Sequence, residues 1–228
     1  MKLFELTRAL IDIESITGNE KAVGDFLYEY LRPVAQRYGG QVERMEVEPK
    51  RFNVLAWWGR PEVVLSTHID TVPPFLTSRE DADFIWGRGA CDTKGIIASM
   101  LKAMESLLEG GRRDLGVLLV VGEERNSAGA RRANTQPRGT RYLINGEPTE
   151  NKLAVGSKGA LRLEVEATGR MAHSAYPELG ESAILKLLDA LGRLRKIRWP
   201  RDRTLGETTC NIGTITGGRA PNVIPDRA

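Results

Sequence analysis

Apolar positions recur at helical spacing in three stretches of the first half of the chain. Residues 3–13 form a short amphipathic pattern, and a longer apolar face runs from Val23 to Val34. The preceding Thr17-Gly18-Asn19-Glu20 has the form of a capping box, which predicts that a helix starts there. Pro33 predicts a kink or an end in that helix. A third helix is predicted over 95–108.

Short apolar runs lie between and after these helical patterns. They predict strands at 41–48, 53–58, 63–67, 117–121 and 141–144. Strands that alternate with helices predict an α/β fold with a mostly parallel sheet flanked by helices on both faces.

The pattern changes near Gly156. Residues 159–169 alternate strictly between apolar and polar side chains, which predicts a half-exposed antiparallel strand. A helix is predicted over 181–196, and a further strand over 208–216. We therefore expect an α/β domain at 1–157 and a small α+β domain at 158–228.

Composition narrows the class of protein without defining it. The chain is 41% hydrophobic and 28% charged, and its formal net charge of +3 is too small to indicate a nucleic-acid partner. The basic stretch 193–203 is interpreted as a solvated helix end. No run approaches the roughly 20 apolar residues of a membrane span. Two cysteines make no disulfide framework. We expect a cytoplasmic protein that binds neither nucleic acid nor membranes.

Acidic and histidine residues stand where the predicted strands end or where a helix begins. Each of them alone has an ordinary structural explanation, such as a solvated turn or a helix cap. Because ligands bind outside the carboxyl ends of parallel strands, their common placement predicts that they converge. The residues are His68, Asp70, Asp92, Glu123, Glu124 and Glu147.

The spacing of these residues suits a metal site. His68 and Asp70 lie on the same side of an extended chain, so one can bind a metal while the other orients its ring. Glu123 and Glu124 point differently, so one can bind metal while the other takes a proton from water. Asp92 has two oxygens and can bridge two ions about 3.5–4 Å apart.

The glycine-rich run 87–95 around Asp92 does not match a phosphate-binding loop, because Lys94 precedes its glycine. Its glycines are interpreted as allowing close backbone approach to the metal site. Cys91 is expected to be a small neighbour of Asp92 and not a nucleophile.

Five segments occur in a fixed order: STHIDTVPP, GRGACDTKG, VGEERNSAGA, NGEPT and GRMAHSAYPELGESAI. Together they resemble the zinc exopeptidase and deacylase family of acetylornithine deacetylase, succinyl-diaminopimelate desuccinylase, aminoacylase and carboxypeptidase G. The resemblance covers essentially the whole chain. It implies a zinc-exopeptidase-like catalytic domain with an inserted α+β dimerisation lid domain, and a dizinc hydrolase that removes acyl groups from N-acylated amino acids.

The resemblance also implies roles for the metal ligands. Asp92 would bridge two zinc ions, for which cobalt or manganese could substitute. His68 and Glu147 would complete one zinc site, and Glu124 would bind the other ion.

Further roles follow from the same resemblance. Glu123 would be the general base, and Asp70 would orient the histidine ligand. In a homodimer formed through the lid, His173 would stabilise the oxyanion in the partner's active site. Asn222, in the segment PNVIP, would lie near an N-acyl amino acid or peptide substrate.

One feature departs from the family pattern. The family supplies a last histidine ligand from a C-terminal segment, whereas His68 and His173 are the only histidines here. We therefore expect both domains to be incomplete, and the chain alone to bind at most one zinc tightly and to be inactive. The alternative functions are a metal-dependent dipeptidase or carboxypeptidase of the same family, and a truncated dimerisation module without catalysis.

Overall fold

The computed structural model describes residues 1–228, which divide into two compact units, Met1–Lys152 and Leu153–Ala228. The division falls a few residues before the expected boundary after residue 157. No helix is both long and apolar enough to span a bilayer.

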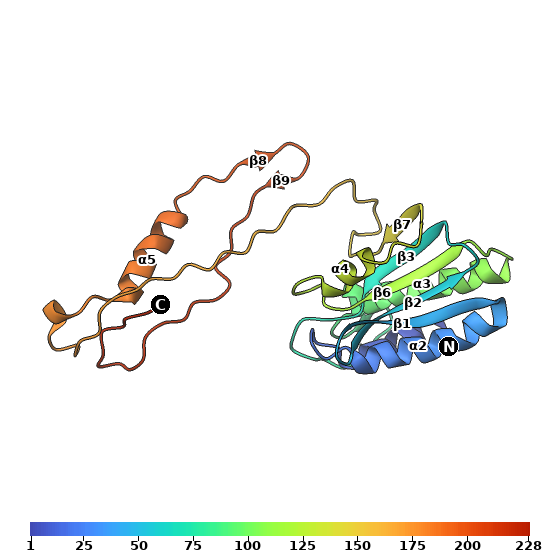
Figure 1. Cartoon of the computed structure of the whole chain (residues 1–228), viewed down its shortest axis with the longest axis horizontal. Helices are drawn as coiled ribbons and strands as arrows, with labels where there is room; N and C mark the ends of the chain where they lie inside the picture. The colour runs from blue at the N-terminus through green and yellow to red at the C-terminus, as the bar shows by residue number, and fades with distance from the viewer. The chain divides into compact units, whose positions relative to one another are not determined.

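The first unit is built on a five-stranded sheet with the order β1-β2-β6-β3-β7 (Figure 1). β3 runs parallel to both β6 and β7, whereas β1, β2 and β6 pair antiparallel. The predicted α/β class is confirmed, and the parallel strands carry the candidate site. The strands are β1 (Gly40–Glu48), β2 (Arg51–Trp58), β3 (Val63–His68), β6 (Leu115–Val120) and β7 (Tyr142–Asn145).

Three helices, α1 (Leu3–Ile11), α2 (Lys21–Tyr38) and α3 (Gly95–Glu109), share one core with the sheet. Alternate residues of β2 and β6 point into that core, because side chains of a strand alternate between its faces. The short helix α4 (Ala128–Asn134), which the sequence did not predict, lies against the opposite face (Figure 1). The fully buried core includes Leu6, Leu10, Leu27, Leu31, Val54, Trp58, Ile97, Leu101, Val117 and Leu119.

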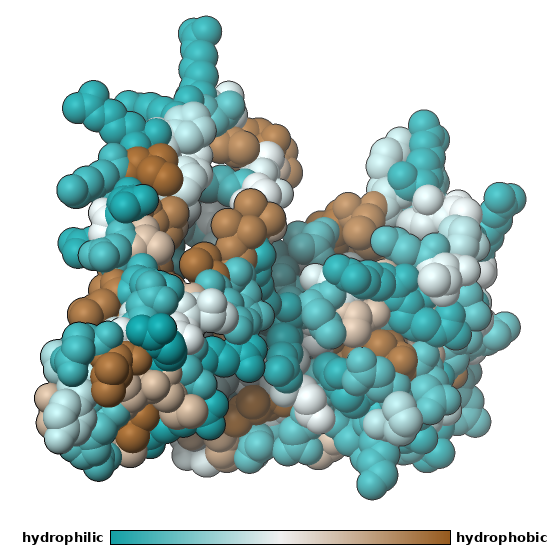
Figure 2. Space-filling model, turned by 60° about the vertical axis from the view of Figure 1, so that its left-hand side comes forward, coloured by the Kyte–Doolittle hydropathy of each residue, from teal (hydrophilic) through white to brown (hydrophobic).

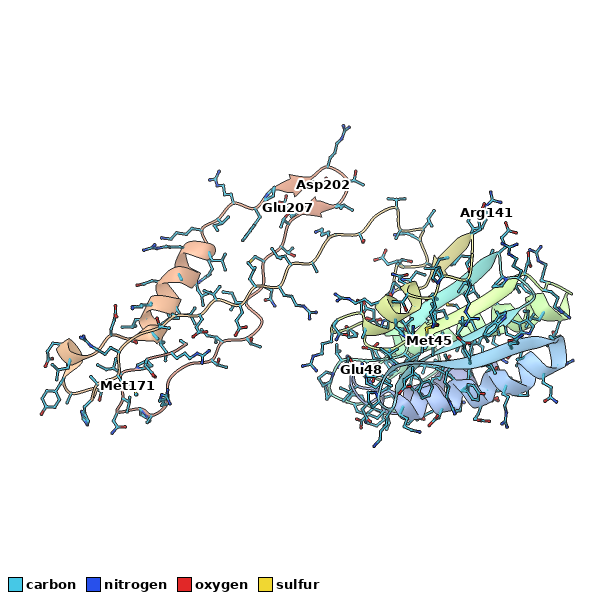
Figure 3. The ribbon with its side chains drawn as sticks, in the orientation of Figure 1. Met45, Glu48, Arg141, Met171, Asp202 and Glu207 are labelled. Atoms are coloured by element: carbon cyan, nitrogen blue, oxygen red, sulfur yellow. The ribbon has the colours of Figure 1, made fainter.

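Shorter elements complete both units. The first unit has a small hairpin of β4 (Arg79–Glu80) and β5 (Ile85–Trp86), and a helical turn η1 (Ala90–Lys94) that leads into α3. The second unit contains η2 (Pro177–Leu179), α5 (Ala183–Leu194), β8 (Arg201–Asp202) and β9 (Gly206–Glu207). Asp202 and Glu207 mark the two strands of its hairpin (Figure 3).

The strands predicted over 159–169 and 208–216 are wrong. Neither segment is a strand in the structure. Only the end of the first segment is paired: Ala167 and Ala228 exchange two backbone hydrogen bonds and the Gly169 amide donates to Asp226, around an isolated bridge of Thr168 with Arg227. Leu161 and Leu163 are 82% and 76% exposed, and apolar side chains stand at the surface in Figure 2. Alternation specifies two faces of a strand but supplies no partner, and a strand needs a neighbour for stability.

The capping box expected at Thr17 is not formed. The helix α2 begins at Lys21, its N-cap is Glu20 in a helical conformation, and no side chain caps it. The Thr17 hydroxyl instead donates to the carboxylate of Asp70 at 2.7 Å. The helix also continues through Pro33 to Tyr38. A charged acceptor makes a stronger hydrogen bond than a neutral one, which explains where the hydroxyl goes.

The carboxylate of Glu20 is fully buried and is held by Arg51. Nε and Nη2 of the arginine donate to its two oxygens at 2.8 and 2.6 Å, and Nη1 donates to Glu48 at 2.6 Å. Glu48 lies at the end of β1 (Figure 3). The arginine also contacts the turn before Glu123, since a Cβ on Gly122 would come within 3.0 Å of its Nη2. These ion pairs therefore join the start of α2, β2 and the end of β1, next to the turn after β6.

Replacing Arg51 by methionine should lower the free energy of unfolding by about 3 kcal/mol, because it leaves a buried carboxylate without a partner. Urea denaturation measures the change. Arg32→Met is the matched control, since the Arg32–Glu29 pair is exposed, and it should shift the free energy by less than about 0.5 kcal/mol. Equal effects of the two substitutions would contradict the role given to the buried pair.

Candidate metal centre

The parallel register of β3 brings the predicted site residues to one edge of the sheet. His68 pairs with Val120 of β6, so the turn that carries Glu123 and Glu124 starts beside it. On the other side Ser66 pairs with Asn145 of β7, which places Glu147 just beyond the same edge. The convergence expected from the strand ends is therefore present in the fold.

Four carboxylates surround one imidazole at this edge. His68 Nε2 lies 2.9 Å from Asp92 Oδ1, 3.8 Å from Glu147 Oε2 and 4.0 Å from Glu123 Oε2. Ligand atoms of His68, Asp92 and Glu124 all lie within 4.8 Å of one another. His68 is buried, while Asp92 and Glu123 are exposed, so the cluster is open to solvent on the carboxylate side.

Asp70 lies behind this cluster and is fully buried. Its carboxylate accepts the backbone N–H of Glu123 at 3.0 Å and of Glu124 at 3.2 Å, besides the Thr17 hydroxyl. Nδ1 of His68 lies 3.5 Å from Asp70 Oδ1 but only 2.9 Å from the Asp70 backbone carbonyl oxygen. A proton on Nδ1 satisfies that carbonyl, and in the neutral ring it leaves the lone pair of Nε2 facing the carboxylates.

The turn that carries Asp92 is held from both sides. The Thr93 hydroxyl donates to the backbone carbonyl of His68 at 2.5 Å, and Lys94 Nζ donates to the carbonyl of Ile13 at 2.6 Å. Lys94 is only 1% exposed, and burial lowers its pKa to about 8. The sequence analysis did not predict this role of Lys94. The available signal was a lysine in a glycine-rich run, two residues after the candidate ligand Asp92.

Burial and the neighbouring negative charges shift the pKa values of His68, Glu124 and Glu147. Burial disfavours the charged imidazole of His68, but Asp70, Glu147 and Asp92 outweigh it and raise the pKa to about 9. Burial, followed by the charge of Asp92, raises the pKa of Glu124, and burial also raises the pKa of Glu147.

Asp70 behaves in the opposite way to these carboxylates. Burial opposes its ionisation, yet hydrogen bonds from His68, Thr17 and the Glu123 amide hold its pKa below the usual value. The site thus contains an ionised Asp70 behind a cluster whose carboxylates repel one another.

The donor set fits a divalent cation. It offers one imidazole nitrogen and carboxylate oxygens, which are the ligands of zinc and of similar ions. Burial and the neighbouring negative charges both raise the pKa of Glu124 and Glu147, and a cation between these carboxylates would offset the repulsion among them. A cavity of about 210 Å³ opens beside the cluster, between polar groups of His68, Glu123 and Glu147 and an apolar wall that includes Leu118 and Val120.

The two remaining predicted residues lie in the second unit. His173 forms an antiparallel bridge with Val223, and the amide of Ser174 donates to the Asn222 carbonyl at 3.0 Å. Nδ1 of His173 accepts the amide of Ala175 at 3.1 Å. His173 and Asn222 are therefore on neighbouring segments of this unit and are exposed.

The amino-acid sequence matches known peptidases. Residues 155–228 match the family model described as the peptidase dimerisation domain. The chain is 42% identical to an M20 peptidase domain-containing protein of Schizosaccharomyces pombe, over 99% of this chain and 58% of that protein. It is 39% identical to a protein of Uncinocarpus reesii named "Probable carboxypeptidase", over 100% of this chain and 59% of that one. The chain thus spans less than two thirds of the length of these curated relatives.

Solved structures share the fold. A tripeptidase of Staphylococcus aureus superposes with a TM-score of 0.68 at 23% identity, over 99% of this chain and 63% of the other. An M20 family metallo-carboxypeptidase of Sulfolobus solfataricus has a TM-score of 0.61 at 15% identity, over 100% of this chain and 69% of the other. These structures show that the chain shares their α/β fold. The sequence comparisons identify the chain as a relative of the M20 peptidases, and its residues 155–228 match the peptidase dimerisation domain.

Zinc affinity should rise with pH up to about pH 9. Because the raised pKa of His68 leaves its ring protonated at neutral pH, binding must displace a proton. The apparent association constant should then increase about tenfold per pH unit between pH 7 and 8.5, with close to one proton released per ion. Calorimetry in buffers of different ionisation enthalpy measures both quantities. An affinity that does not change across this range would contradict the raised pKa of His68.

Proposed function

We propose that this protein is a metal-dependent hydrolase that cleaves short peptides, of the carboxypeptidase or dipeptidase type. The convergence of His68, Asp92, Glu124 and Glu147 at the edge of the parallel strands carries the proposal. The relatives named as carboxypeptidase and M20 peptidase favour a peptide substrate. The dipeptidase or carboxypeptidase alternative is thereby preferred over the deacylase expected first.

Two zinc ions are proposed as the cofactor, with cobalt or manganese as substitutes. Asp92 would bridge them, His68 and Glu147 would hold one, and Glu124 would hold the other. When bound, such a pair supplies an acidified water molecule and polarises the scissile carbonyl group. The chain contributes the positions of the ligands, which come from four separate segments that meet at one edge of the sheet: the end of β3, the turn η1, and the segments after β6 and β7.

Glu123 is proposed as the general base. Its carboxylate is exposed and lies 4.0 Å from His68 Nε2, while its backbone is fixed by the hydrogen bond to Asp70. An exposed carboxylate on a fixed backbone can accept a proton from the attacking water and pass it to the leaving amine. Asp70 would serve as the orienting group for His68 and for this turn.

The second unit is proposed to form a homodimer through residues 155–228, where the dimerisation-domain model matches. His173 is proposed to stabilise the oxyanion in the partner's active site, and Asn222 to contact the substrate. Both side chains are exposed in the single chain, as residues that act on another subunit must be.

Removal of acyl groups from N-acylated amino acids remains a second candidate function, because the five ordered motifs also suit that activity. A substrate panel separates the two. In a full-length version of the protein with added zinc or cobalt, short peptides with a free carboxyl terminus should be hydrolysed at least about tenfold faster, as kcat/KM, than N-acetylmethionine or N-acetylornithine. The reverse order would assign the protein to the deacylases.

Replacement of the adjacent glutamates separates their roles. In a full-length version of the protein, Glu123→Gln should keep zinc affinity within about twofold but lower kcat by about 100-fold or more, because the amide keeps the shape and loses the proton acceptor. Glu124→Gln should weaken zinc binding by about tenfold. Metal content and turnover are measured on the same samples. Equal loss of zinc in both variants would contradict the assignment.

A further inference from the structure

The segment between α1 and α2 lies directly behind the cluster. Ile16 and Thr71 form a parallel bridge, with the Thr71 amide donating to Ser15 at 2.9 Å and the Thr17 amide donating to Thr71 at 3.1 Å. These backbone bonds fix Thr17 beside Asp70. The Thr17 hydroxyl then makes the shortest hydrogen bond to the Asp70 carboxylate, 2.7 Å to Oδ2.

The two oxygens of Asp70 have different partners. Oδ2 accepts the Thr17 hydroxyl and the amide of Glu124, and Oδ1 accepts the amide of Glu123 and lies 3.5 Å from His68 Nδ1. A carboxylate group can rotate about its Cβ–Cγ bond. Such a rotation would break the hydrogen bonds that Asp70 accepts from the amides of Glu123 and Glu124. The hydroxyl, held by its own backbone, opposes that rotation.

The hydroxyl has no competing structural use. Thr17 lies outside α2, which begins at Lys21 and has no side-chain cap. Its side chain is half-buried, and Asp70 is its hydrogen-bond acceptor. Burial of a carboxylate is costly unless its oxygens are hydrogen-bonded. Loss of the Thr17 hydroxyl would therefore destabilise the position of Asp70 and of the Glu123 and Glu124 amides that bond to it.

We propose that Thr17 is a positioning residue for the metal centre: its hydroxyl fixes the Asp70 carboxylate, and through it the turn that carries Glu123 and Glu124. The consequence for metal binding rests on the proposed function. The consequence for the turn itself does not, because it concerns backbone hydrogen bonds in the metal-free chain. The two consequences can therefore be tested separately.

The test compares Thr17→Val, which replaces the hydroxyl by a methyl group of similar size, with Thr17→Ser, which keeps the hydroxyl. Thr7→Val is the matched control, because Thr7 is buried and its hydroxyl bonds only to the Leu3 carbonyl within α1. Hydrogen exchange of the Glu123 and Glu124 amides is measured by NMR in metal-free protein, and zinc affinity by calorimetry.

Thr17→Val should speed exchange of both amides by about tenfold and weaken zinc binding by about tenfold. Thr17→Ser should restore both values to within about twofold of wild type, and Thr7→Val should change neither. If Thr17→Val does not fold, Thr17→Ala removes the same hydroxyl without the added methyl group, and the same results are expected.

Wild-type exchange of the two amides in Thr17→Val would overturn the proposal, and so would a serine variant that behaves like the valine variant. Absence of zinc binding by the wild-type chain would instead count against the proposed function. In that case the amide exchange still decides the role of Thr17.

Discussion

The parallel pairing of β3 with β6 and β7 is the constraint on which the site depends. Parallel strands end at the same edge, so the residues that follow them meet there even though they are far apart in sequence. The register sets His68 opposite Val120 and Ser66 opposite Asn145. A shift of one residue in either pairing would turn the His68 side chain to the other face of the sheet. The core under α1, α2 and α3 fixes that register.

A second constraint is electrostatic. Asp92, Glu123, Glu124 and Glu147 face a single imidazole. Burial lowers the pKa of His68, but Asp70, Glu147 and Asp92 outweigh burial and raise the pKa to about 9. Such an arrangement is costly without a cation, because like charges in a partly buried site repel. Two cationic side chains that are not part of the cluster pack behind it. Lys94 ties the Asp92 turn to the segment before α2, and Arg51 lies close to Gly122 in the turn that leads to Glu123.

The sequence predicted the first unit far better than the second. Helix α3 and strands β3 and β6 follow from apolar periodicity, because their own side chains build the core. The residues of the cluster were predicted from their position after strands and from the family motifs. The supporting contacts were not, since Thr17 and Lys94 bond to partners more than fifty residues away. The two strands expected around Leu161 and Ile212 failed because a period of two specifies faces and leaves the hydrogen-bond partner undefined.

The most direct test of the metal centre is X-ray absorption at the zinc edge on the chain loaded with one equivalent of zinc. The account predicts a first shell of nitrogen and oxygen only, at about 2.0–2.2 Å, with the outer-shell pattern of an imidazole that disappears in His68→Ala. A sulfur shell at about 2.3 Å would instead place zinc on a cysteine such as Cys91, which is free and exposed beside Asp92. That result, or an imidazole pattern unchanged by His68→Ala, would contradict the assignment of the site.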